Sequence, residues 1–281
     1  MNFFEFIKIV FLGIVEGITE FLPISSTGHL LLFERVLKPQ CLADESFSEL
    51  FTVVVQLGAI MAVVLIYFRQ LWPIGKTGDK HYFIQGPKIY LWIKILVAFL
   101  PAMIFGLILD NVFDLMFHGR ASIITIMITM IFYGIVFLFI ENYHKTHPPK
   151  YNSLGSISMK MALYIGCFQV LAMIPGTSRS GITIIGAMLL GASRSVATEF
   201  TFFLEIPTLF GASMLKLIKY RFEFNGMQYA ILLAAMIVAF LVAFATVSWM
   251  INYIKKHDFK VFGYYRIALG ILIFIGLMIF K

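Results

Sequence analysis

Residues 16–29 read Glu16-Gly-Ile-Thr-Glu20-Phe-Leu-Pro-Ile-Ser25-Ser26-Thr27-Gly28-His29, and this stretch decides the fold. It begins inside the apolar segment Phe6–Leu22 and is followed by a short apolar run, Leu30–Leu37. Neither run reaches the roughly 20 residues that cross a bilayer. Irregular backbone at membrane depth is tolerated only where protein or trapped water satisfies its polar groups. We therefore expect a re-entrant helix–loop–helix hairpin here.

A second stretch has the same layout. Met159–Ile174 is apolar, then come Pro175-Gly-Thr-Ser-Arg179-Ser-Gly181 and a further apolar run, Ile182–Gly191. We expect a second re-entrant hairpin. Six other apolar runs have the length of a membrane crossing. They are Phe47–Phe68, Tyr90–Leu109, Ala121–Ile140, Glu199–Ile218, Gln228–Ile251 and Phe262–Phe280.

The composition agrees with a membrane protein. The chain of 281 residues is 60% hydrophobic and 13% charged, whereas a soluble domain carries about 25% charged residues. Its 30 Phe exclude a disordered chain, and unbroken apolar runs exclude a membrane β-barrel. The net charge of +7 comes from Lys and Arg mostly in the gaps between runs, where they meet anionic lipid. We expect an all-α polytopic membrane protein with no nucleic-acid partner.

An internal repeat relates the two hairpins. A shift of 153 positions places Gly13 on Gly166 and Ser25 on Ser178, and further along it places Tyr67 on Tyr220. Each unit holds one hairpin and three crossings, so the second copy must enter the membrane upside down. The sequence thus predicts one membrane domain over 1–281, built from an inverted-topology repeat of about 1–141 and 154–281. In such folds the broken helices form the binding site near the midplane.

Glu16 and Glu20 are four residues apart and share one helix face. Carboxylates at membrane depth are costly, which favours a functional role over a structural one. They could ligate a divalent cation, orient a histidine or share a proton, and the spacing does not choose among these roles.

The hydroxyl groups of Ser25, Ser26 and Thr27 lie just beyond, together with His29. Pro23 ends the helix, so these residues are expected on an irregular turn. A serine becomes a nucleophile when a neighbour takes its proton, and a histidine suits that task. The structural alternative is a helix cap beside a hydrogen-bonded histidine.

The second loop has the composition of a phosphate site. Glycines let backbone N–H groups approach an anion, hydroxyls donate, and Arg179 offers a planar fork at the start of a helix. The GK[ST] ending of a Walker loop is missing. Candidate substrate-binding residues are Gly176, Thr177, Ser178, Ser180 and Thr183, with Ser25 and Thr27 from the first loop and Gln56 from the first crossing. Glu199 either pairs with Arg194 or joins the site.

These residues carry a resemblance. Residues 16–29, the stretch Pro175–Thr183 and Glu199-Phe-Thr-Phe closely match the bacterial undecaprenyl-diphosphate phosphatases, also called bacitracin-resistance proteins, over essentially the whole chain. The resemblance implies hydrolysis of a C55 polyprenyl diphosphate to its monophosphate, for recycling of the cell-wall lipid carrier in the bacterial cytoplasmic membrane. It maps the functional positions onto Glu16, Glu20, Ser25, Ser26, His29, Ser178, Arg179 and Thr183. Glu205 departs from the family, which has a small or apolar residue there.

The chemistry inferred from the residues agrees with this resemblance. Arg179 and the loop amides would stabilise the phosphates, Ser26 would attack, and His29 would take its proton. Glu16 and Glu20 would orient His29 or hold Mg²⁺ or Ca²⁺, and no organic cofactor is expected. The alternative is a transporter that moves the polyprenyl phosphate through the same site. Polyprenyl diphosphate and membrane lipids are the expected partners, and a homodimer is left open.

The orientation follows from counting Lys and Arg in the gaps. The gaps on one side of the membrane carry ten Lys and Arg residues and those on the other side carry six, so the first side is expected to be cytoplasmic. Both termini are then extracytoplasmic, and the resemblance implies a site that opens to the outer face.

Overall fold

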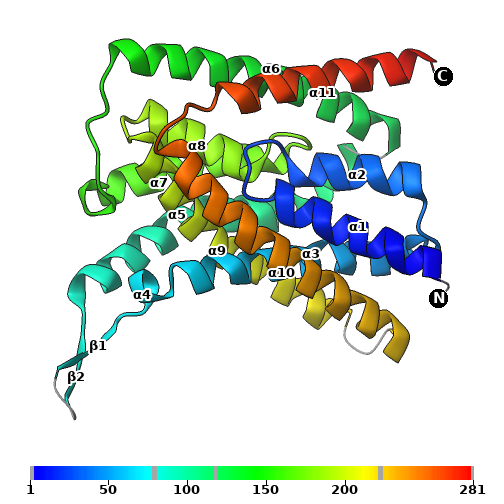
Figure 1. Ribbon diagram of the computed structural model, residues 1–281, viewed down its shortest axis with the longest axis horizontal. Coiled ribbons are helices and arrows are strands. Elements are labelled where there is room, and N and C mark those ends of the chain that lie inside the picture. Colours follow the sequence, from blue (N-terminus) through cyan, green and yellow to red (C-terminus); the bar gives the residue numbers. More distant parts are fainter. Residues whose placement is uncertain (1–2, 78–80, 117–118, 221–223, 280–281) are drawn as a thin grey trace.

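The computed structural model describes residues 3–77, 81–116, 119–220 and 224–279. Lys80, Arg221 and Lys281, which enter the charge count above, lie outside these residues. Within the described part the regular secondary structure is helical except for a small hairpin of β1 (Ile74–Thr77) and β2 (His81–Ile84), which projects from one end (Figure 1). The prediction of an all-α fold is confirmed.

Among the described residues, six helices are long and apolar enough to cross a membrane, which confirms the predicted number of crossings. They are α3 (Glu45–Ile66), α5 (Gly86–Met116), α6 (Gly119–Thr146), α9 (Arg194–Lys219), α10 (Gly226–Ile254) and α11 (Lys260–Ile279). Several extend beyond the apolar runs into polar residues. A short helix, α4 (Phe68–Leu71), and two 3₁₀ turns, η1 (Gln40–Leu42) and η2 (Leu154–Ser156), lie in the connections.

Each predicted hairpin is a pair of short helices in contact. The first pairs α1 (Phe3–Thr19) with α2 (Ser26–Leu37), and the second pairs α7 (Met159–Val170), followed by η3 (Leu171–Met173), with α8 (Arg179–Leu189). The break in the first hairpin is shorter than the sequence suggested, because the irregular turn ends at Ser25. Ser26, Thr27 and His29 therefore lie in the first turn of α2, and their expected place on an irregular turn is wrong.

A serine cap explains where α2 and α8 begin. The Oγ of Ser25 accepts a hydrogen bond from the Gly28 N–H at 3.3 Å, and the Oγ of Ser178 accepts one from the Gly181 N–H at 3.1 Å. A serine at this position satisfies an N–H that the helix itself leaves without a partner. Both serines adopt a positive φ, 74° and 70°, which is unusual for a residue other than glycine. The two loops thus share a cap and a strained conformation.

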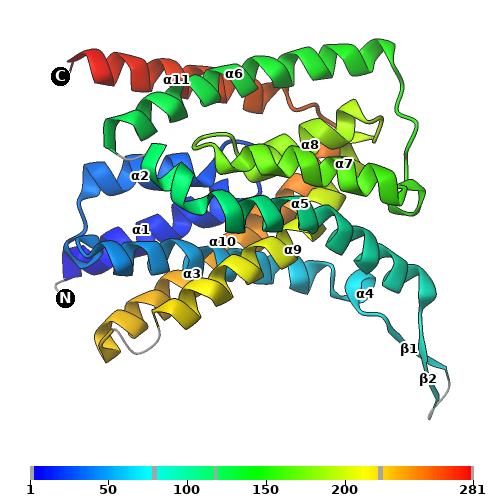
Figure 2. The ribbon, with the colours of Figure 1, turned by 180° about the vertical axis from the view of Figure 1, so that it is seen from behind.

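The long helices pack against the two hairpins. α6 and α11 lie side by side along one edge, while α1 contacts α10 and α10 contacts α3 (Figure 1). On the reverse side, α7 contacts α5 (Figure 2). The same relation appears in both halves, since α1 against α10 and α7 against α5 are each a hairpin helix on a crossing.

Glycines allow the hairpin helices to approach these crossings closely. A Cβ built on Gly13 would lie 3.0 Å from the carbonyl oxygen of Ala235 in α10. A Cβ built on Gly166 would overlap the backbone of Ala98 in α5. Small residues of this kind let helix backbones meet in a membrane. The glycine in each hairpin therefore fixes the depth and angle at which the hairpin packs.

We expect Gly166→Ala to destabilise the protein by about 1–3 kcal/mol, because the added methyl group meets backbone atoms that cannot rotate away. Thermal unfolding in detergent measures the change. Gly106→Ala in α5 is the matched control, since a Cβ there has no heavy atom within 4 Å. Equal unfolding temperatures for the two variants would contradict the close packing of α7 on α5.

Candidate active site between the two hairpins

The loops of the two hairpins are in direct contact. The hydroxyl of Ser180, in the first turn of α8, donates to the carbonyl oxygens of Glu20 at 3.1 Å and Leu22 at 3.2 Å. Its Oγ also lies 3.2 Å from the Oγ of Ser178. One hydroxyl of the second hairpin therefore satisfies backbone acceptors of the first, where the chain is not helical. From the sequence, Ser180 was expected to bind the substrate. In the structure its hydroxyl instead donates to backbone carbonyl oxygens of the first hairpin.

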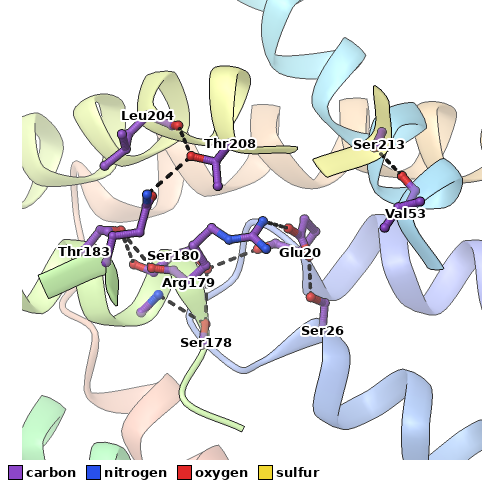
Figure 3. Close-up of polar contacts among 12 residues, drawn as sticks. Glu20, Ser26, Val53, Ser178, Arg179, Ser180, Thr183, Leu204, Thr208 and Ser213 are labelled. Carbon is purple, nitrogen blue, oxygen red and sulfur yellow. Dashed lines mark hydrogen bonds and ion pairs between the residues drawn. The ribbon is translucent and has the colours of Figure 1, made fainter. Parts of the chain in front are cut away.

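The carboxylate of Glu20 joins the two hairpins. It accepts a hydrogen bond from the Ser26 hydroxyl through one oxygen and from the Arg179 guanidinium at 3.4 Å through the other (Figure 3). The side chain of Glu20 is 3% exposed and that of Arg179 is 26% exposed. A buried acid thus holds a hydroxyl and a cation beside each other, with the cation accessible from outside.

His29 makes no hydrogen bond to Ser26 in this arrangement. Its Nδ1 lies 2.7 Å from the carbonyl oxygen of Ser25, and its Nε2 lies 2.7 Å from the hydroxyl of Tyr265. A carbonyl oxygen only accepts, so Nδ1 carries a proton, and in the neutral ring Nε2 accepts from Tyr265. The group that receives the Ser26 hydrogen bond is Glu20. The structure therefore does not bring together the predicted Ser26 and His29 pair.

The second loop is shaped by close contacts. Gly176 has a φ of 82°, and a Cβ there would meet Thr129 and Ile126 of α6, so no other residue fits without a shift. The hydroxyl of Thr183 donates to the carbonyl oxygen of Arg179 at 2.9 Å and accepts from Thr201 at 3.0 Å. Thr183 thus holds the backbone carbonyl group of Arg179 in place.

Three other candidates lie differently. Thr177 is buried in the loop, whereas Thr27 is exposed on the outer face of α2. Gln56 is buried on α3, but it makes no hydrogen bond to either loop within the described part of the chain. The structure brings together Glu20, Ser26, Ser178, Arg179 and Ser180, and leaves Thr27 and Gln56 outside this group.

Two buried carboxyl groups have no hydrogen-bond partner among the described residues. These are Glu16 on α1 and Glu205 on α9, whose side chains are 0% and 1% exposed. Unpartnered carboxyl oxygens are suitable ligands for a hard divalent cation such as Mg²⁺ or Ca²⁺. The described residues contain no ready-made group of three or more acidic, histidine or cysteine side chains for a metal. Any cation would therefore need ligands from a substrate or water as well.

Two residues of α11 belong to the site and were not singled out in the sequence. Tyr265 contacts His29, and the fully buried Arg266 donates to backbone carbonyls of both loops. The signal was present, because an arginine within an apolar crossing is costly and marks a functional region. The proposed pairing of Glu199 with Arg194 is wrong. Arg194 instead forms a bidentate ion pair with Glu141, at 2.5–3.0 Å.

In the described part of the chain, six crossing helices and two interrupted hairpins, with a hydroxyl, a carboxylate and an arginine in contact, define a multi-pass membrane protein with a buried polar site. The chain belongs to the family described as "Bacitracin resistance protein BacA", whose sequence profile matches residues 9–272.

Related proteins cover nearly the whole chain. A protein of Lachnoclostridium phytofermentans, named undecaprenyl-diphosphatase, is 52% identical over 273 residues, which is 97% of each chain. Proteins with the same name from Desulfitobacterium hafniense and Enterococcus faecalis are 49% and 48% identical. They cover 97% of this chain, and 96% and 97% of their own lengths are matched.

Proposed function

We propose that the protein is an undecaprenyl-diphosphatase, which hydrolyses a polyprenyl diphosphate to the monophosphate and phosphate. The observation that carries this proposal is the Glu20 carboxylate, bound at once by the Ser26 hydroxyl and the Arg179 guanidinium from the opposite hairpin. A nucleophile, an acceptor for its proton and a cation for the phosphates are the groups that phosphoryl transfer requires. The names of relatives at about 50% identity support the same reaction.

The contacts suggest a sequence of steps. Arg179 binds the terminal phosphate, and Glu20 takes the proton of Ser26 as Oγ attacks the phosphorus. The bond from phosphorus to the bridging oxygen breaks, and the polyprenyl monophosphate leaves with both electrons of that bond and with the proton that Glu20 had taken, so Glu20 is ionised again. A water molecule, deprotonated by the same carboxylate, then attacks the phosphoserine and releases phosphate. Ser26 recovers its proton from Glu20.

The Ser26 assignment rests on its contact with a carboxylate, and it has a clear competitor. His29 could itself receive the phosphoryl group, although Nδ1 and Nε2 are both engaged in the structure. The observed hydrogen bonds favour Ser26. His29 then acts through its place beside Ser25 rather than as the base.

A divalent cation is proposed as part of the working site. Glu16 would hold it, since both of its carboxyl oxygens are buried and have no hydrogen-bond partner among the described residues. When bound, Mg²⁺ or Ca²⁺ would neutralise charge on the diphosphate.

Transport of the monophosphate carrier is the second candidate. It is supported by the matched serine caps of α2 and α8, which a shift of 153 residues superposes, as in an inverted repeat of about 1–141 and 154–281. Such repeats are common among transporters. Release of phosphate from undecaprenyl diphosphate by the purified protein in detergent distinguishes the two functions. Translocation in vesicles without phosphate release would contradict the enzyme proposal.

The setting of the site is also proposed. We place the protein in the bacterial cytoplasmic membrane with the hairpin loops open to the outer face, where the diphosphate carrier is released. A homodimer is compatible with this arrangement and is not required by it, because one chain supplies all the residues named above.

We expect Arg179→Lys and Arg179→Ala to lower kcat/KM by about a hundredfold or more, because an ammonium cannot replace the planar fork on a phosphate. Phosphate release measures the loss. Arg69→Lys, at an exposed arginine of α4, is the control and should keep the normal rate. Near-normal turnover of both Arg179 variants would exclude Arg179 as the phosphate ligand.

Ser26→Ala should lower kcat by about a thousandfold or more if Ser26 is the nucleophile. Ser195→Ala on α9 is the control. The phosphorylated residue can be trapped by acid quench with labelled substrate and located by mass spectrometry. Phosphoserine at position 26 is the expected result, and phosphohistidine at position 29 would exclude the proposed nucleophile.

Chelation should abolish activity, and added Mg²⁺ or Ca²⁺ should restore it. Glu16→Gln should then raise the metal concentration needed for half-maximal rate by about tenfold, since a carboxylate ligand is lost. A metal titration of phosphate release measures this shift. Full activity after exhaustive chelation would assign Glu16 to another role.

The proposed orientation predicts which positions can be labelled from outside. In a Cys41→Ser, Cys167→Ser background, a thiol reagent that cannot cross the membrane should modify Ala43→Cys in intact cells but not Ser153→Cys. Both positions are exposed. Disrupted cells, in which both should react, provide the control. The reverse pattern in intact cells would place the loops on the cytoplasmic side.

A further inference from the structure

Arg266 is a buried cation that forms no ion pair with an acid among the described residues. Its side chain is 0% exposed, and its hydrogen bonds within this part of the chain go to backbone carbonyl oxygens. Nη1 donates to Pro23 at 3.1 Å, while Nη2 donates to Gly176 at 2.8 Å and to Thr177 at 3.2 Å, with Thr129 of α6 at 3.4 Å. A charge in such a place is costly, so its contacts must matter for the protein.

The carbonyls that Arg266 holds belong to both loops. Pro23 lies two residues before Ser25, and Thr177 directly precedes Ser178. These two serines are the residues with strained, positive φ angles, and strained backbone persists only where surrounding contacts over-determine it. The peptide between Thr177 and Ser178 is planar, so fixing its carbonyl toward Arg266 turns the Ser178 N–H the opposite way. Arg179 follows Ser178 directly, so the backbone orientation of Ser178 also sets the direction in which the chain enters Arg179.

Tyr265, which directly precedes Arg266 in α11, contacts His29. Its hydroxyl lies 2.7 Å from Nε2 of His29, and the two rings stack at 5.7 Å with an angle of 9°. The hydroxyl and the Ser25 carbonyl engage both ring nitrogens, so they fix the rotation of the imidazole.

The rest of α11 gives these two side chains a rigid base. Gly134 of α6 and Gly263 of α11 face each other, and a Cβ on either would lie 2.8–2.9 Å from the carbonyl oxygen of the other. The helices are therefore in backbone contact just before Tyr265. Neighbouring Tyr264 is largely exposed.

We propose that Tyr265 and Arg266 are positioning residues of the active site: Arg266 fixes the two loops relative to each other, and Tyr265 fixes the ring of His29. The proposal rests on the phosphatase function above. It explains why a helix outside both hairpins carries a buried charge. Neither side chain is assigned a contact with the substrate.

Kinetics test the role of Arg266. We expect Arg266→Lys to raise the KM for undecaprenyl diphosphate by about fivefold or more and to lower kcat, because the phosphate-binding loop is no longer held in place. KM does not depend on the fraction of molecules that fold, so a purely structural role would lower the yield of active protein and leave KM unchanged. That result would overturn the proposal. Arg266→Gln, which buries no charge, is the second variant if the lysine variant does not fold.

Tyr265 is tested with a spectroscopic signature. In protein labelled with ¹⁵N-histidine, the Nε2 resonance of His29, assigned by its loss in His29→Gln, should move in Tyr265→Phe and stay in place in the control Tyr264→Phe. Tyr265→Phe should also lower kcat by about tenfold at equal amounts of folded protein, as expected when His29 no longer holds the Ser25 carbonyl beside Ser26 in a fixed position. An unchanged resonance or a normal kcat in Tyr265→Phe would overturn the assignment.

The controls separate this proposal from the proposed function. A wild-type protein that releases no phosphate would contradict the phosphatase function itself. A wild-type protein that is active, with Arg266→Lys and Tyr265→Phe indistinguishable from it, would contradict only the positioning role.

Discussion

The structure depends on one constraint: two helices are interrupted inside a protein whose surroundings are apolar, and the polar groups freed at each break need partners. The hydroxyl oxygens of Ser25 and Ser178 accept hydrogen bonds from the N–H groups of Gly28 and Gly181. Carbonyl oxygens of the first loop are satisfied from outside it, by Ser180 of the opposite hairpin and by Arg266. The contacts that allow the helices to break are therefore the contacts that bring the two loops together.

This arrangement explains why the site is divided between the two halves. The shift that places Ser25 on Ser178 also places Ser26 on Arg179, Glu16 on Gln169 and His29 on Ile182. The cap serines are thus kept in both loops, while the side chains that follow them differ. One hairpin supplies the hydroxyl and the acids, and the other supplies the cation. Glu20, in contact with both Ser26 and Arg179, joins these contributions into one site.

The electrostatics of the site also depend on both hairpins and on α11. Glu16, Glu20 and Glu205 are buried, and only Glu20 has a cationic partner among the described residues. Arg266 is more deeply buried and donates its hydrogen bonds to carbonyl oxygens, so Arg179 is the cation left to meet a diphosphate among the site residues that the structure describes. A substrate with several negative charges would add to the buried acids, which is the physical reason to expect a divalent cation with it.

The sequence by itself determined the six crossings, the two hairpins and the candidate loops. Long apolar runs and their polar interruptions are local properties, and the bilayer thickness turns run length directly into topology. The family resemblance likewise follows from contiguous motifs such as residues 16–29. The sequence pattern was less reliable at helix ends. Ser26 and His29 were expected on an irregular turn, whereas the cap at Ser25 starts α2 at Ser26 and places both residues in the helix.

Only the tertiary structure decided which side chains meet. It placed Ser26 on Glu20 rather than on His29, paired Arg194 with Glu141, and left Thr27 and Gln56 outside the site. It also brought Tyr265 to His29 and Arg266 to Pro23, two residues of the first hairpin that lie more than a hundred positions away in the chain. These contacts depend on the angles at which α1, α8 and α11 pack, and such angles come from glycine contacts and buried volumes across the whole molecule, which no short stretch of sequence contains.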